Sequence, residues 1–135
     1  MIKPTILVTG GAGYVGSHVC IALSDAGFVP VSFDDLRSGH RELVRWGPFE
    51  FGSLQDGGRL SEVIAEHRPL ACVHLAGSSS LAESGSQATM YWQNNVLGSE
   101  VLIECLSGIE HLNLLDPMGN VRAEAPEIIM NDIIV

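Results

Sequence analysis

Positive charge is scarce in this sequence. Its 135 residues include seven Lys and Arg against sixteen Asp and Glu, which gives a formal net charge of −9. Nucleic acids and anionic membranes are bound through clusters of Lys and Arg, so this balance argues against both as partners. Long hydrophobic runs are missing too: no segment approaches the ~20 residues of a membrane-spanning helix, and the N-terminus lacks a signal-peptide pattern. We therefore expect a cytoplasmic protein.

Cysteine and histidine are too few and too scattered to indicate a disulfide framework or a metal site. The three cysteines, Cys20, Cys72 and Cys105, are widely spaced in apolar surroundings, which is typical of reduced core residues. The histidines fall on different predicted elements without the spacing of metal ligands. They are His18, His40, His67, His74 and His111. The sequence therefore predicts no bound metal.

A cluster of glycines organises the rest of the chain. An apolar, β-branched run at residues 5–8 leads into Thr9-Gly10-Gly11-Ala12-Gly13-Tyr14-Val15-Gly16, and a helical pattern follows directly. Glycine lets the backbone turn sharply and approach a ligand, and the N–H groups at a helix start attract a pyrophosphate. A G-x-G-x-x-G motif between a strand and a helix predicts a dinucleotide site rather than a purely structural turn.

Predicted strands and helices alternate along a single domain whose 46% hydrophobic content indicates a well-buried core. The strands are expected at residues 5–10, 29–34, 49–54, 71–76 and 112–115, and the helices at 14–26, 39–46, 59–67 and 87–106. Ser38 is the predicted N-cap of the second helix. Such alternation produces a parallel sheet with right-handed crossovers. We predict an α/β fold, a doubly wound Rossmann-type sheet of order 3-2-1-4-5, with its ligand crevice at the carboxyl ends of the first and fourth strands.

The second predicted strand ends in two acids, Asp34 and Asp35, near the distance from the glycines at which a dinucleotide site places its ribose-binding acid. Adjacent residues of a strand point in opposite directions, so Asp34 alone is expected to face the ribose, and an acid/base pair of both carboxylates is disfavoured. A carboxylate there repels a 2′-phosphate, which favours NAD over NADP, although Arg37 nearby could accommodate the phosphate.

Four motifs carry a resemblance to a known family. They are VTGGAGYVGSH at residues 8–18, FDDL at 33–36, HLAG at 74–77 and YWQNNV at 91–96. Over residues 4–111 the chain resembles the amino-terminal part of the extended short-chain dehydrogenase/reductases. Within these it is most similar to the NAD-dependent epimerase/dehydratase family and its UDP-glucose 4-epimerases. The resemblance implies NAD as the cofactor and, as the family's reaction, inversion at C4 of a UDP-hexose.

The resemblance also implies which residues contact NAD. Tyr14 and Val15 would lie over the pyrophosphate, beside the glycines Gly10, Gly13 and Gly16. Asp34 would bind the ribose hydroxyls, with Asp35 and Leu36 beside the adenosine and with Ser38 and Gly39 closing the loop. Leu54 would flank the adenine next to Ser53, and Leu75, Ala76 and Gly77 would line the middle of the cofactor, which Ser79 and Asn95 would also meet. It implies no metal ligand.

Two serines stand where the family carries charged residues. Ser53 replaces an acid that recognises the adenine amino group, and Ser79 replaces a lysine that touches the cofactor. Losing a charge-assisted hydrogen bond at each place predicts weaker NAD binding, by about 1 kcal/mol per site. The run Ser78–Ser80 also resembles a nucleophile cluster, but because the sequence places no His–Asp pair beside it, hydrogen bonding to the cofactor is preferred.

The family's catalytic pair is absent. The family uses a tyrosine followed four residues later by a lysine, with the tyrosine as acid/base on the sugar hydroxyl and the lysine lowering its pKa. Here Tyr14 and Tyr91 are followed at that spacing by His18 and Asn95, and the one lysine is Lys3. We therefore assign no catalytic residue.

The last part of the chain departs from the family. We expect an NAD-binding domain at residues 1–116 and a divergent tail at 117–135, in which 117–127 is a linker or turn and 128–135 an added strand or interface segment. A frameshift or truncated gene is a further explanation of the tail. Two functions stay open. One is the cofactor half of an epimerase, which meets a UDP-sugar only if another chain completes it. The other is a noncatalytic NAD-binding or interaction module that forms a homodimer.

Overall fold

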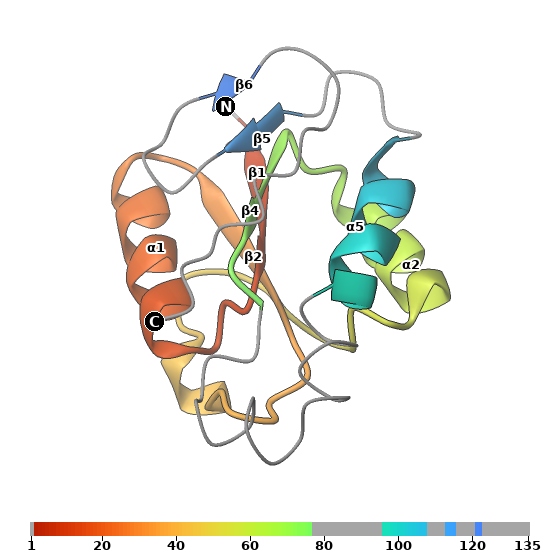
Figure 1. Cartoon of the computed structure of the whole chain (residues 1–135). Coiled ribbons are helices and arrows are strands. Elements are labelled where there is room, and N and C mark those ends of the chain that lie inside the picture. The colour runs from red at the N-terminus through yellow and green to blue at the C-terminus, as the bar shows by residue number, and fades with distance from the viewer. Residues whose placement is uncertain (1, 77–95, 108–112, 116–120, 123–135) are drawn as a thin grey trace.

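Helices and strands alternate in the computed structural model, which describes residues 2–76, 96–107, 113–115 and 121–122. The strands are β1 (Thr5–Thr9), β2 (Val29–Asp34), β3 (Phe49–Phe51), β4 (Ala71–His74), β5 (Asn113–Leu115) and β6 (Val121–Arg122). The helices are α1 (Tyr14–Asp25), the 3-10 helix η1 (Arg41–Leu43), α2 (Gly57–His67) and α5 (Gly98–Ser107) (Figure 1). None of these helices is long and apolar enough to cross a membrane.

The strands form one sheet of order β3-β2-β1-β4-β5-β6. β1 lies at the centre, where Val8 pairs with Ser32 of β2 on one side and with Val73 of β4 on the other. Pairing is parallel from β3 to β5, and β6 is added antiparallel to β5. The predicted α/β class and the order 3-2-1-4-5 are confirmed.

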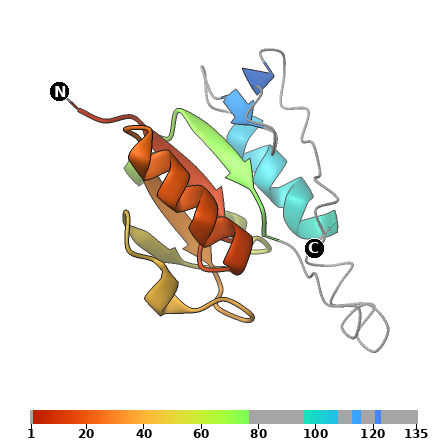
Figure 2. The same ribbon diagram turned by 90° about the vertical axis from the view of Figure 1, so that its left-hand side faces the viewer.

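Helices cover both faces of the sheet: α1 lies on one face, and α2 and α5 lie on the other (Figures 1 and 2). Because successive residues of a strand point to opposite faces, each strand contributes side chains to two hydrophobic cores, one on each face of the sheet. Leu7 and Phe33 pack with Leu60 of α2 and Leu102 of α5 in one core. Ile6, Val8 and Val73 pack with Cys20 of α1 in the other. This doubly wound arrangement leaves the carboxyl ends of β1, β2 and β4 together at one edge.

The predicted helix at residues 39–46 is wrong. The chain forms the three-residue η1 instead, with His40 rather than Ser38 as its N-cap and with Val44 already extended at φ −90° and ψ 100°. The His40 N–H donates to the carbonyl oxygen of Ala12, 2.9 Å away, so this segment is held by the glycine turn. With no buried residue in η1, no apolar face stabilises a longer helix.

The edge beyond β5 also differs from expectation. Residues 117–127 were predicted as a linker or turn, but Val121 pairs with Leu115 and Arg122 with Leu114. The edge of β5 carries N–H and C=O groups that an added strand can pair, and a returning segment supplies that strand. The predicted strand or interface segment at 128–135 lies outside the described residues.

Candidate functional site

β1 runs into a tight turn, residues 10–13, that requires glycine at defined positions. Gly10 has a φ of +76°, and a Cβ on it would lie 2.9 Å from the Ala76 nitrogen. Gly16, in the first turn of α1, faces the Gly10 carbonyl so closely that no side chain fits between them. The Gly10 N–H donates to the Phe33 carbonyl at 2.8 Å. The glycine turn is therefore packed against the ends of both neighbouring strands.

The start of α1 lies beside this turn. Gly13 is the N-cap, and no side chain of the described residues caps the helix. Tyr14 and Val15 are 78% and 36% exposed, and the Tyr14 ring meets His18 edge-on with centroids 4.8 Å apart. The first N–H groups of a helix and the positive end of its dipole attract anions. This end of α1 can accept a phosphate group, as the sequence predicts.

Asp34 ends β2 and reaches the glycine turn. Its side chain is buried, with Oδ2 accepting the Ala12 N–H at 3.0 Å and Oδ1 accepting the Leu36 N–H at 2.9 Å. Burial raises the pKa of Asp34, and the hydrogen bonds from Leu36 and Ala12 oppose that rise. The Asp35 carboxylate instead accepts the Arg37 N–H at 3.0 Å, within its own loop. The two acids thus have different partners, and the structure brings only Asp34 to the turn.

The loop after β2 closes over the other side of the glycine turn. Ala12, which is fully buried, donates its N–H to Asp34 and accepts the His40 N–H on its carbonyl oxygen. Gly39 lies against it, since a Cβ there would be 3.0 Å from the Ala12 Cβ. Ser38 is exposed on the same loop. The loop therefore lies beside the turn through Leu36, which bonds Asp34, and through Gly39, and it carries Ser38 between them.

Leu36 adopts a φ of 60°, a conformation that costs a residue with a side chain about 1–2 kcal/mol. Its N–H bond to Asp34 holds it there. We expect Leu36→Asn, a residue that tolerates this conformation, to keep the free energy of unfolding within about 0.5 kcal/mol of the wild type. Leu36→Val is β-branched and should lower it by about 1 kcal/mol or more. Urea unfolding of both variants checks this, and equal stabilities would contradict a left-handed Leu36 in solution.

Past β4, the chain is tied back to β1 by a buried hydroxyl. Thr9 Oγ1 lies 2.6 Å from His74 Nδ1, 3.1 Å from the Leu75 nitrogen and 3.2 Å from the Ala76 nitrogen. The second ring nitrogen of His74 lies 2.8 Å from Ser99 Oγ, on α5. Burial lowers the pKa of His74 to about 4, so the imidazole is neutral near pH 7. The structure thus places Leu75 and Ala76 beside Gly10, where the sequence predicts the middle of the cofactor.

The remaining predicted contacts lie before α2 or outside the described residues. Ser53 Oγ accepts the Gln55 N–H at 3.2 Å in the turn before α2. Leu54 is 3% exposed and packs in the core with Leu60. The other three residues are not described: Gly77, Ser79 and Asn95.

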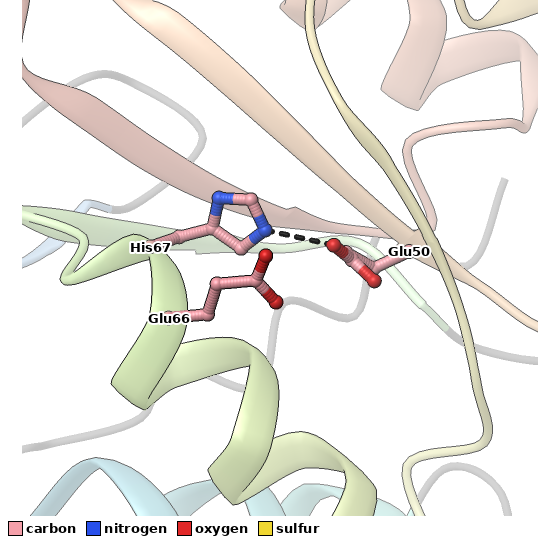
Figure 3. A group of neighbouring side chains, drawn as sticks. All are labelled: Glu50, Glu66 and His67. Atoms are coloured by element: carbon pink, nitrogen blue, oxygen red, sulfur yellow. Dashed lines mark hydrogen bonds and ion pairs between the residues drawn. The ribbon is translucent and has the colours of Figure 1, made fainter.

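Away from the crevice, Glu50, Glu66 and His67 offer ligand atoms within 4.8 Å of one another (Figure 3). Sequence reasoning missed this group because Glu50 is on β3 and His67 ends α2. Glu50 Oε1 lies 2.8 Å from His67 Nε2, and its Oε2 pairs with Arg59. The bond to His67, and after it the Arg59 contact, hold the pKa of Glu50 below its usual range. Because the Arg59 guanidinium already pairs with one oxygen of the Glu50 carboxylate, the arrangement indicates a structural link between β3 and α2 rather than a cation site.

A model of the NAD dependent epimerase/dehydratase family matches residues 6–115. The chain belongs to this family. The epimerase-family chain is 47% identical over 103 residues to a UDP-glucose 4-epimerase of Rhizobium leguminosarum bv. trifolii, covering 76% of this chain and 32% of the relative. It therefore spans about a third of the length of this curated relative.

Solved structures of the same family share its fold. UDP-glucose 4-epimerase from Brucella ovis, crystallised with NAD, has a TM-score of 0.80 and 36% identity over 84% of this chain and 35% of that one. The enzyme from Thermotoga maritima, crystallised with UDP-glucose, has a TM-score of 0.79 and 33% identity over 83% and 37%. The resemblance drawn from the four sequence motifs is confirmed.

Sequence reasoning missed four residues that shape the crevice of this epimerase-family domain: Thr9, Ala12, His74 and Ser99. Ala12 acts through its main-chain N–H and carbonyl groups, and the identity of its side chain gives no sign of these hydrogen bonds. Thr9 and His74 lie inside the motifs quoted above, but an apolar strand pattern gives no sign that a hydroxyl and an imidazole meet across two strands. Ser99 comes from a helix 25 residues beyond His74.

Proposed function

We propose that this chain binds NAD at the carboxyl ends of β1, β2 and β4. The pyrophosphate would lie over the start of α1 and the adenosine ribose on Asp34. The observation that carries the proposal is the Asp34 carboxylate, buried at the end of β2 and hydrogen-bonded to the glycine turn. A carboxylate oxygen accepts more than one hydrogen bond, so Asp34 can bond the ribose hydroxyls while it holds the turn.

We further propose that the domain is the cofactor-binding part of a cytoplasmic nucleotide-sugar epimerase similar to UDP-glucose 4-epimerase. Support comes from the family match and from solved relatives that hold NAD or UDP-glucose. The 135 residues contain no tyrosine followed four residues later by lysine. By themselves they would therefore bind NAD without epimerising a sugar. The same absence favours the second candidate, a noncatalytic NAD-binding module, and the two differ in whether another chain restores turnover.

Calorimetry of the purified chain with NAD and with NADP tests the first proposal. NAD should bind about tenfold more tightly or better, because the Asp34 carboxylate repels the 2′-phosphate of NADP. Equal affinity for the two, or no binding of NAD at millimolar concentration, would reject the site. In a coupled assay with UDP-galactose the chain alone should give no UDP-glucose, and measurable turnover would reject the noncatalytic part of the proposal.

Restoring the family's acid at position 53 should strengthen this binding. Ser53→Asp is expected to raise NAD affinity about fivefold, since a carboxylate makes a charge-assisted hydrogen bond to the adenine amino group that serine lacks. Gln55→Glu is the matched control, because it adds the same charge two residues away on an exposed side chain. Calorimetry measures both. An equal gain in both variants, or none in Ser53→Asp, would show that Ser53 does not meet the adenine.

A further inference from the structure

The Thr9 hydroxyl, which is fully buried, defines the hydrogen-bond roles around it. A hydroxyl has one hydrogen to donate and two lone pairs that accept. The N–H groups of Leu75 and Ala76 face its accepting side, at 3.1 and 3.2 Å, and the Leu75 N–H is shared with the Thr9 main-chain carbonyl oxygen at 3.0 Å. With both N–H groups on the lone pairs, the hydroxyl hydrogen is left for His74 Nδ1, 2.6 Å away. In this arrangement His74 accepts at Nδ1 and carries its hydrogen on Nε2, which lies 2.8 Å from Ser99 Oγ.

This chain of hydrogen bonds crosses three elements at the edge where the crevice lies. Thr9 is the last residue of β1, His74 the last of β4, and Ser99 stands near the start of α5. The Leu75–Ala76 peptide lies between the Thr9 hydroxyl and Gly10. It is so close to Gly10 that a Cβ on that glycine would lie 2.9 Å from the Ala76 nitrogen. A shift of the hydroxyl would move this peptide relative to the glycine turn.

We propose that His74 is a positioning residue for the cofactor crevice, because its neutral imidazole orients the Thr9 hydroxyl and so holds the Leu75 and Ala76 N–H groups against the glycine turn. The inference rests on the proposed NAD site. With its hydrogen on Nδ1, the imidazole would donate to the hydroxyl oxygen and leave only one lone pair for the two N–H groups. An apolar side chain would leave the hydroxyl hydrogen without an acceptor, and either change loosens the hold of Thr9 on the Leu75–Ala76 peptide beside the glycine turn.

Two pairs of variants separate this role from simple packing. His74→Asn places an amide oxygen near the position of Nδ1 and keeps an acceptor for Thr9, whereas His74→Leu preserves much of the volume and removes the acceptor. Thr9→Ser keeps the hydroxyl and Thr9→Val removes it. We expect NAD affinity to fall about tenfold in the Leu and Val variants and to stay within about threefold in the Asn and Ser variants. If His74→Leu does not fold, the Thr9 pair makes the same comparison.

NMR of the wild type and the variants gives a readout that does not depend on NAD. Long-range ¹H–¹⁵N spectra should show the His74 hydrogen on Nε2. The amide hydrogen of Ala76 should exchange about tenfold faster in the Leu and Val variants than in the Asn and Ser variants, whereas the Leu75 amide, which also bonds the Thr9 main-chain carbonyl, should change less. A hydrogen on Nδ1, or equal exchange and equal NAD affinity across each pair, would overturn the inference. If the wild type binds no NAD, the proposed function fails while the exchange and tautomer measurements still decide the role of His74.

Discussion

Replacing Gly16 by alanine is expected to lower the free energy of unfolding by about 3 kcal/mol and to weaken NAD binding about 100-fold. The added methyl group would run into the carbonyl oxygen of Gly10 and approach the Cα of Gly11 to 2.9 Å. Both are main-chain atoms, so no flexible side chain can move aside. The start of α1 must then shift away from the glycine turn, and the N–H groups proposed to bind the pyrophosphate shift with it.

Gly13→Ala is the matched control for this experiment. Gly13 belongs to the same turn, but its φ is −83°, and among the described residues a Cβ on it would meet the Gly10 oxygen at 3.4 Å, an ordinary contact. We expect this variant to keep most of the stability of the wild type, and because Gly13 itself belongs to the proposed pyrophosphate site, the two variants are compared in stability alone. Urea unfolding measures both. Equal losses would show that the turn requires glycine for a reason other than the close approach of Gly16 to Gly10.

Asp34→Asn is expected to weaken NAD binding about 10- to 100-fold, because a hydrogen bond to a charged acceptor contributes about 1.5–3 kcal/mol. An amide offers one oxygen where the carboxylate offers two, so the variant cannot accept from both Ala12 and Leu36. It also removes the charge that repels a 2′-phosphate, and the preference for NAD over NADP should narrow. Asp35→Asn makes the same change beside it and should weaken NAD binding less than Asp34→Asn, since the Asp35 carboxylate accepts the Arg37 N–H within its own loop and does not reach the glycine turn. Equal effects of the two substitutions would contradict the role of Asp34.

The pH dependence of NAD binding supplies a second check on Asp34. Burial raises the pKa of this carboxyl, and the protonated form loses an acceptor for the ribose. Wild-type affinity should therefore fall as pH decreases through the raised pKa, and the fall should begin at a higher pH than for an exposed aspartate. Asp34→Asn does not titrate there and should show a flatter profile. A wild-type profile that stays flat down to the pH of unfolding would argue against a carboxylate–ribose contact.

The fold could be predicted from the sequence because its determinants are local and periodic. The glycine turn between an apolar strand and a helix, and the repeated strand–helix alternation, imply a parallel sheet and its order. The helix at residues 39–46 could not be rejected in this way, since what shortens it is the His40 bond to Ala12, 28 positions earlier in the chain. β6 escaped prediction for a similar reason: the partner edge of β5, and not its own two residues, makes it a strand.

In the candidate site, too, local sequence patterns could be predicted and contacts between distant segments could not. The glycines and Asp34 stand out because their spacing after two predicted strands matches that of a dinucleotide site. The link from Thr9 through His74 to Ser99 does not stand out, since its meaning depends on which nitrogen carries a hydrogen and on a packing of β1, β4 and α5 that spacing does not reveal. Contacts from residues 77–95 stay predictions.

The central place of β1 in the sheet has a consequence for how the protein reaches its native state. β1 is synthesised before β4, and the hydrogen bond between Thr9 and His74, 65 residues apart, forms only once both strands are in place. Bringing such distant segments together costs loop-closure entropy before any contact repays it, so parallel pairings of this kind form late in folding. The crevice therefore does not exist in a half-folded chain, and a nucleotide that binds it draws only on the fully assembled sheet. By mass action such a ligand would raise the free energy of unfolding of the native state, but it would not speed the folding of the chain.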